Sequence, residues 1–156
     1  MLTPRKGRLL ISEPSLIEEI FFKSVILLTH HSSNESIGLI LNNPAKIKLN
    51  EIINDVPLSD FPVYIGGPVE KNTIHFIHTL GRKITGSKEL IQGLYWGGDF
   101  KIVLDLMLSN KISNKDIRFF IGYSGWQSQQ LSEEIGRNEW LINKSNKKIC
   151  MQYSTS

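Results

Sequence analysis

The chain has 156 residues, of which 40% are hydrophobic and 9% aromatic. This length suits one domain with a packed core, because domains commonly run roughly 100 to 200 residues. With 21% charged residues and no long block of like charge, the composition excludes disordered, collagen-like and coiled-coil proteins. The whole chain, 1–156, is therefore predicted to form a single domain.

The net charge of +3 comes from the two ends of the chain. Segments 1–8 and 143–156 hold six basic residues and no acidic one, which leaves 12 Lys and Arg against 15 Asp and Glu in between. Both segments are therefore expected to be basic tails. A DNA-binding domain instead gathers cations on one folded face. Direct DNA binding is not favoured, and through tails alone it would be weak, independent of sequence and sensitive to salt.

A single cysteine, Cys150, allows no disulfide within the chain and favours a reducing cytoplasm. The basic start is followed by only three aliphatic residues, 9–11, which is too short for the core of a signal peptide. The longest purely aliphatic runs have about four residues, against roughly 20 needed to cross a bilayer. The sequence therefore predicts a soluble, cytoplasmic protein with no membrane segment.

Short β-rich runs open the chain. The strands predicted in the first half are 8–11, 24–29 and 37–41. Polar residues 30–36 join the last two as a hairpin, and Asn42-Asn43-Pro44 ends the third because proline cannot donate to a strand ladder. Helical spacing then predicts a short helix over 49–54, with Asn50 as its N-cap.

Glycine pairs interrupt the second half. A strand at 63–65 is predicted to turn at Gly66-Gly67-Pro68 and to return as 73–80, forming a second hairpin. Asp99 is predicted to cap a helix ending at Leu108, which is apolar on nearly every side and should therefore be buried. The last predicted elements are a strand at 117–121, a turn at 122–126 and a helix at 128–137.

Six sequence blocks follow one another along the chain in a distinctive order. They are GRLLISEP (7–14), FKSVILL (22–28), GLILN (38–42), YIGGPV (64–69), GLYWGGD (93–99) and RFFIGYSGW (118–126). Their order and spacing resemble those of the YqgE/AlgH family of bacterial proteins. The resemblance implies an α+β fold with a mixed, mostly antiparallel sheet bent towards a pseudo-barrel and a few flanking helices. It also implies a role in transcriptional regulation, but the family has no established catalytic residues to transfer.

One segment resembles a catalytic motif. Gly122-Tyr123-Ser124-Gly125 lies between a predicted strand and a predicted helix, as the nucleophile of a hydrolase does. The nucleophile elbow requires Gly-x-Ser-x-Gly, however, and Trp126 occupies the place of the second glycine. A packed turn is therefore favoured over a catalytic serine.

Four histidines raise the question of a metal site. His75 and His78 lie three residues apart on a predicted strand and so point to opposite faces, and the adjacent His30 and His31 diverge in the same way. Zinc requires three or four ligands, and a site built from His31, His78 and Asp99 is the geometry left open. A structural or surface role is favoured for the histidines, and neither a metal nor a cofactor is predicted.

Glycines beside aromatic residues suggest a binding surface. Gly66-Gly67 and Gly97-Gly98 could cradle an anion. The carboxylate of Asp99, which follows the second pair, would repel a phosphate at that pair. Turns are favoured for both pairs, and the neighbouring rings could pack in the core or stack on a ligand. The predicted ligand or partner groove consists of His31, Asn42, Gly66, Gly67, His78, Trp96, Asp99, Tyr123 and Trp126.

The favoured function is that of a non-enzymatic, cytosolic binding or regulatory protein with a protein or small-molecule partner. The alternative is a small hydrolase-like enzyme. It would use the loops around His31, His78, Asp99 and Ser124, and it requires these four side chains to converge in a cleft.

Overall fold

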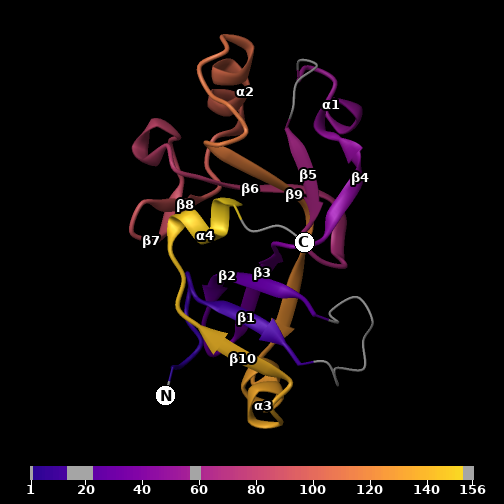
Figure 1. Cartoon of the computed structure of the whole chain (residues 1–156), viewed down its shortest axis with the longest axis vertical. Coiled ribbons are helices and arrows are strands. Elements are labelled where there is room, and N and C mark those ends of the chain that lie inside the picture. The colour runs from indigo at the N-terminus through magenta and orange to yellow at the C-terminus, as the bar shows by residue number, and fades with distance from the viewer. Residues whose placement is uncertain (1, 14–22, 57–60, 153–156) are drawn as a thin grey trace.

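Ten strands and four α-helices form in the described residues, 2–13, 23–56 and 61–152, of this computed structural model (Figure 1). The strands are β1 (Leu9–Ser12), β2 (Val25–His31), β3 (Glu35–Ile40), β4 (Pro44–Lys48), β5 (Pro62–Ile65), β6 (Val69–His78), β7 (Lys88–Ile91), β8 (Leu94–Trp96), β9 (Ile117–Gln127) and β10 (Trp140–Asn143). The helices are α1 (Leu49–Ile52), α2 (Phe100–Leu108), α3 (Gln130–Gly136) and α4 (Lys147–Gln152). The α+β class predicted from the sequence is confirmed.

The sheet is open and mostly antiparallel. Its strands follow the order β10-β1-β2-β3-β9-β6-β8-β7, and β5 branches from β9 and carries β4. The long strand β9 makes this branch, because its first half pairs in parallel with β5 and its second half pairs with β3. Gly7, just before β1, lies against Leu90 and Ile91 of β7, so β7 at one end of the sheet approaches the strand next to the other end. The expected bend towards a barrel is therefore present, but the sheet does not close.

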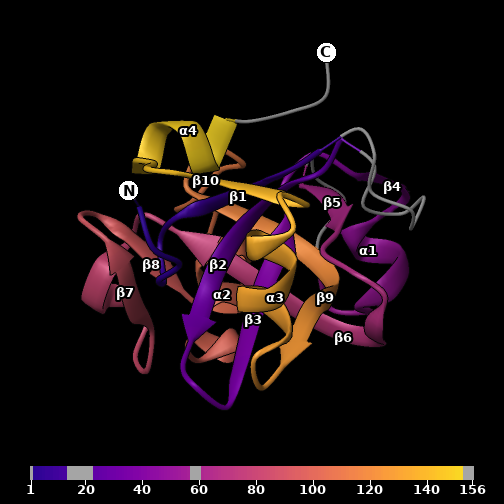
Figure 2. The same cartoon turned by 90° about the horizontal axis from the view of Figure 1, so that it is seen from below.

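Alternating side chains of the central strands enter different cores, as the two-residue period of a strand requires. On β9, Phe119 packs beside Val103 of α2, whereas Phe120 enters the inner core between the two arms of the bent sheet. On β2, Leu27 enters that inner core and Ile26 faces α3. Figure 1 shows the result, with α1 and α2 at one end of the molecule and α3 at the other, and Figure 2 views the molecule from the α3 end.

The two predicted hairpins have opposite outcomes. The first is confirmed, because β2 and β3 pair antiparallel. The second is wrong, because β9 lies between β5 and β6. Phe119 pairs with Val63 of β5 on one side and with Phe76 of β6 on the other. Strands β5 and β6, which are consecutive in the sequence, are thus separated in the sheet by β9, which begins about 50 residues after β5.

The predicted turn at 122–126 is also wrong. Strand β9 continues to Gln127, and Gly125 pairs with Ile37 of β3. Gly122 has a φ of +67° at the point where β6 leaves its regular register with β9. The glycine therefore absorbs a local irregularity within a strand, a position that favours a residue without a Cβ.

The helices differ from expectation mainly in burial. Asp99 caps α2 as predicted, since its Oδ1 accepts a hydrogen bond from the backbone N–H of Lys101 at 2.9 Å. The burial predicted for α2 is wrong, because only one side of the helix packs on the sheet and Leu108 at its end is 57% exposed. Helix α1 begins at Leu49 after Lys48, so the predicted cap Asn50 lies inside the helix.

The segments expected to be basic tails contain ordered contacts. Within 143–156, Lys147–Gln152 forms α4, and Cys150 on this helix is fully buried. Near the other end, the backbone N–H of Gly7 donates to the carbonyl of Leu28 at 2.7 Å. Across the described ranges, no helix has both the length and the apolar character to span a membrane.

Candidate functional site

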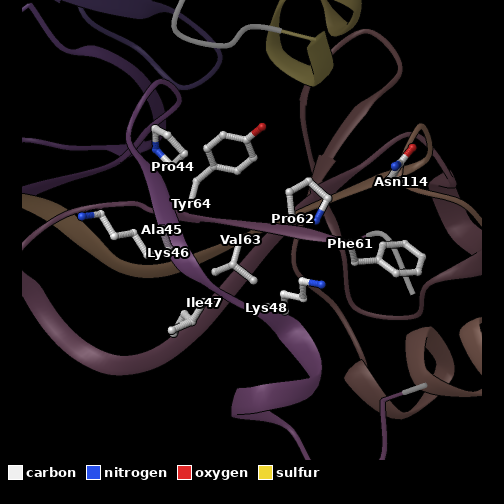
Figure 3. Close-up of a pocket in the computed structure, with 10 residues that line it drawn as sticks. All are labelled: Pro44, Ala45, Lys46, Ile47, Lys48, Phe61, Pro62, Val63, Tyr64 and Asn114. Carbon is white, nitrogen blue, oxygen red and sulfur yellow. The ribbon is translucent and has the colours of Figure 1, made fainter. Parts of the chain in front are cut away.

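A groove of about 480 Å³ lies along β4 and β5 (Figure 3). It is lined by Pro44, Ala45, Lys46, Ile47, Lys48, Phe61, Pro62, Val63, Tyr64 and Asn114. We refer to this surface as the β4–β5 groove.

The pairing of the two strands explains the hollow. Pro44 pairs with Tyr64 and Lys48 pairs with Pro62, so three residues of β4 lie opposite only Val63 of β5. A proline lacks the N–H that a regular ladder needs, and both paired positions contain one. The middle of β4 bulges as a result. In the part of the chain that the structure describes, β4 pairs only with β5, which leaves its second edge open.

The groove combines apolar and positively charged surface. Ile47 is 40% exposed, Lys46 and Lys48 are also exposed, and the ten lining residues include no Asp or Glu. In Figure 3 the Lys48 side chain extends to the side of Phe61, whereas Lys46 extends to the opposite side of the strand. Such a surface suits an occupant that brings both apolar groups and negative charge.

A buried arginine lies behind the Tyr64 wall of the groove. Arg118 on β9 is 4% exposed, and its guanidinium carbon is 4.0 Å from the centre of the Tyr64 ring. It donates one hydrogen bond to the carbonyl of Cys150 and one to the carbonyl of Leu41, both at 2.7 Å. Burial lowers the pKa of Arg118, while Tyr64 raises it. An arginine remains charged in proteins, so a positive charge stands behind this wall.

Sequence reasoning missed these cations, although the sequence contains a signal for each. In 44–48, lysines alternate with Ala45 and Ile47, the period of an exposed strand with one polar face. In the bulged strand the two lysine side chains instead extend in different directions. Arg118 lies two residues before Phe120 and therefore shares its inward face.

The residues predicted to form a groove lie in separate places. His78, Trp96 and Asp99 lie around β6, β8 and the start of α2; Gly66, Gly67 and Tyr123 lie where β5 and β9 meet; His31 and Trp126 lie near α3; and Asn42 follows β3. The side-chain oxygen of Asn42 accepts from the N–H of Val25, and its amide donates to the carbonyl of Lys23. None of the nine lines the β4–β5 groove.

His78 and Asp99 serve the local structure. The Nε2 atom of His78 is 3.0 Å from the carbonyl oxygen of Gly97, and its Nδ1 accepts from the N–H of Leu80 at 3.2 Å. These partners define a neutral ring with the proton on Nε2. The Asp99 carboxylate accepts from Lys101 as the α2 cap. Both side chains are thus occupied by backbone partners.

Ser124 and His31 have other partners again. The Ser124 hydroxyl is fully buried and donates to the carbonyl of Gly66 at 3.0 Å. The Nδ1 atom of His31 is 2.7 Å from the Ser36 hydroxyl. The four residues of the hydrolase alternative therefore make separate contacts and do not form a relay. Among the described residues, no three His, Cys, Asp or Glu side chains are placed to hold a metal ion.

Comparison with known proteins places the chain in a family. The family model described as DUF179, AlgH-like, matches residues 9–156. The chain belongs to this AlgH-like family. A UPF0301 protein from Bacteroides fragilis is 40% identical over 149 residues, which cover 95% of this chain and 76% of that protein. Another from Chlorobaculum parvum is 38% identical and covers 93% and 78% of the two chains. The resemblance to the YqgE/AlgH family is confirmed.

Two solved structures share the fold of this AlgH-like protein. The solution structure of AlgH from Pseudomonas aeruginosa has a TM-score of 0.79 at 24% identity, over 97% of this chain and 84% of that chain. The crystal structure of a Corynebacterium diphtheriae protein has a TM-score of 0.81 at 21% identity, over 98% and 82%. At these identities the two structures support the fold and not an activity.

Trp126 has a structural environment in this AlgH-like protein. Its indole N–H and that of Trp140 both donate to the same carboxylate oxygen of Glu134, at 2.9 and 2.8 Å. The two rings meet edge to face with their centres 5.8 Å apart. Glu134 thus fastens α3 to β9 and β10, and Trp126 is 95% buried in the resulting core.

His78 makes the stability of the protein depend on pH. Burial lowers the pKa of His78, partly offset by its bond to Gly97. As pH falls below the unfolded value of about 6.5, the unfolded state takes up a proton that the folded state resists. The free energy of unfolding should therefore fall with pH, by at most about 1.4 kcal/mol per pH unit from this residue. Urea unfolding at pH 7.5 and 5.5 measures the effect.

The control for this prediction is His78→Gln. This variant should be less stable at pH 7.5 because a buried polar contact changes, but its stability should depend less on pH over the same range. An equal pH dependence in the two proteins would contradict the assignment to His78.

Proposed function

We propose that this AlgH-like protein acts by binding a partner or ligand rather than by catalysis, and that the β4–β5 groove is its binding surface. The observation that carries the proposal is a hollow of about 480 Å³ beside an open strand edge, with two lysines and no acidic residue in its wall. Mostly apolar hollows with a few polar groups are typical binding sites. The engagement of His31, His78, Asp99 and Ser124 in separate structural contacts supports binding over hydrolysis.

We place the protein in the cytoplasm because its single cysteine needs no oxidising compartment. Any role in transcription, which the family resemblance implies, is assigned to a bound partner. Direct reading of DNA would need many cations on one face, whereas residues 9–142 hold 12 Lys and Arg against 15 Asp and Glu.

An apolar anion tests the groove directly. Titration with 8-anilinonaphthalene-1-sulfonate should shift the backbone amide resonances of residues 45–48, 63 and 64 in nitrogen-15 NMR spectra. Shifts confined to other parts of the protein would contradict the assignment of the groove.

Labelled duplex DNA tests the alternative partner. Any affinity should be lost between about 50 and 200 mM salt, the range in which phosphate contacts weaken strongly. Tight, sequence-dependent binding at the higher salt concentration would contradict a function through a protein or small-molecule partner.

A further inference from the structure

We infer that the partner of the β4–β5 groove is an extended peptide segment that combines acidic and apolar residues, with its backbone paired to the open edge of β4 and its side chains reaching the groove. This inference rests on the proposed function and names its partner class. It follows from the charge of the groove, from the exposed strand edge and from the burial of the aromatic rings.

The charge of the groove selects a negative occupant. Residues 9–142 carry more acidic than basic residues, yet the lining of the groove holds Lys46 and Lys48 and no carboxylate. The buried guanidinium of Arg118 adds a positive charge behind Tyr64. A local excess of cations in an otherwise acidic body favours an anionic partner and disfavours a basic one.

The open edge favours a peptide over a compact small molecule. Strand β4 lies at the outer margin of the molecule (Figure 1), and it pairs only with β5 among the described residues. An exposed edge presents backbone donors and acceptors in a row, which an added strand can use. Exposed lysines and prolines on an edge discourage indiscriminate pairing. A strand that carries carboxylates offsets this repulsion, so the same lysines that deter other strands select an acidic one.

The apolar part of the groove defines the rest of the occupant. Val63 forms the floor opposite the bulge, and Ile47 is 40% exposed beside it. Lys46 and Lys48 lie on either side of Ile47 along β4, so a paired strand with carboxylates on both sides of an apolar residue would place one carboxylate opposite each lysine.

Single-stranded nucleic acid, a second kind of extended anion, fits less well. Its sequence-tolerant binding uses open aromatic rings on which bases stack. Phe61 is 94% buried against Phe119, and the Tyr64 ring already carries the Arg118 guanidinium on one face. The groove therefore offers few surfaces for stacking.

The test uses a fluorescein-labelled eight-residue peptide that alternates Glu and Val, compared with peptides that alternate Gln and Val or Lys and Val. Fluorescence anisotropy should give the order Glu, then Gln, then Lys. The double variant Lys46→Gln/Lys48→Gln should weaken the Glu peptide by about 3- to 10-fold at low salt, as expected for two exposed ion pairs. This difference should shrink at higher salt.

The matched control removes two lysines elsewhere. Lys88→Gln/Lys101→Gln makes the same change in net charge at exposed positions outside the groove, and its affinity for the Glu peptide should stay within about 2-fold of the original. An equal loss in both double variants would show that only net charge matters and would overturn the inference.

Two further arms separate the ways of failing. Two methylated forms of the Glu peptide test strand pairing, one with methyl groups on the odd-numbered backbone nitrogens and one on the even-numbered. One of the two forms should lose binding, and unchanged binding of both would overturn strand pairing. Equal binding of all three peptides, with amide shifts at residues 45–48, would overturn the acidic preference but leave the groove as a binding site. An oligo-dT strand that binds there more tightly than the Glu peptide would overturn the peptide class. Shifts at the groove from neither peptide nor dye would contradict the proposed function itself.

Discussion

Replacement of Arg118 by methionine is expected to loosen α4 and to expose the thiol of Cys150. The guanidinium connects the carbonyl of Cys150 on α4 to the carbonyl of Leu41 at the end of β3. Methionine fills a similar space but donates no hydrogen bond. Because hydrogen bonds from a charged donor contribute roughly 1.5–3 kcal/mol each, the free energy of unfolding should fall by about 3 kcal/mol.

The single cysteine of the chain provides the measurement. Cys150 is fully buried, and burial raises the pKa of its thiol, while Ser145 and Arg118 lower it. The loss of Arg118 would therefore slow the reaction of an already exposed thiol with a disulfide reagent. Faster labelling would therefore report more frequent exposure of Cys150 and not a more reactive thiol. We expect an increase of about 30-fold or more, the change that about 2 kcal/mol produces in a local opening equilibrium.

Lys148→Met is the matched control. It removes one positive charge from the exposed side of the same helix and should leave both stability and labelling of Cys150 nearly unchanged. Arg118→Lys keeps the charge but cannot reproduce the planar fork of donors, so it should lie between the original protein and the methionine variant. Unchanged labelling in Arg118→Met would show that α4 is held without this residue.

Local sequence patterns predicted the elements whose partners are close along the chain. The β2–β3 hairpin and the Asp99 cap depend on neighbours a few residues away, and both are confirmed. The predicted pairing of β5 with β6 is wrong because β9, from a distant part of the chain, inserts between them. Gly122 was misread as a turn because a glycine in a bulged strand and a glycine in a turn look alike in sequence.

The candidate site was harder to predict for the same reason. The groove lies at a bulge. Pro44 pairs with Tyr64 at one end of this bulge and Pro62 pairs with Lys48 at the other, a register that cannot be read from 44–48 alone. The conspicuous residues, by contrast, proved to have local partners. His78 and Ser124 bind backbone carbonyls of Gly97 and Gly66. Polar side chains that are buried need such partners, so their chemical reactivity is a poor guide to function in this fold.

Among alanine substitutions in the two glycine pairs, Gly67→Ala is expected to lower the free energy of unfolding the most. A Cβ at Gly67 would overlap the backbone of Tyr123 and Ser124, at the place where β5 leaves β9. Backbone atoms held in a sheet cannot move aside as a flexible side chain can. Overpacking commonly costs about 1–3 kcal/mol, and we expect about 3 kcal/mol or more here, a large share of the roughly 5–15 kcal/mol that stabilises a domain.

Two other glycines separate crowding from the remaining effects of an added methyl group. Gly136 at the end of α3 has no neighbouring atom within 4 Å of such a Cβ, so Gly136→Ala should raise the free energy of unfolding by about 0.5–1 kcal/mol. Gly97 is equally open but has a φ of +70°, so Gly97→Ala should cost about 1–2 kcal/mol from backbone strain alone. Urea unfolding of the three variants should therefore rank Gly136→Ala above Gly97→Ala and both above Gly67→Ala. If Gly67→Ala matched Gly97→Ala, the close approach of β5 to β9 would not limit this position, because crowding would add nothing to the cost of an alanine.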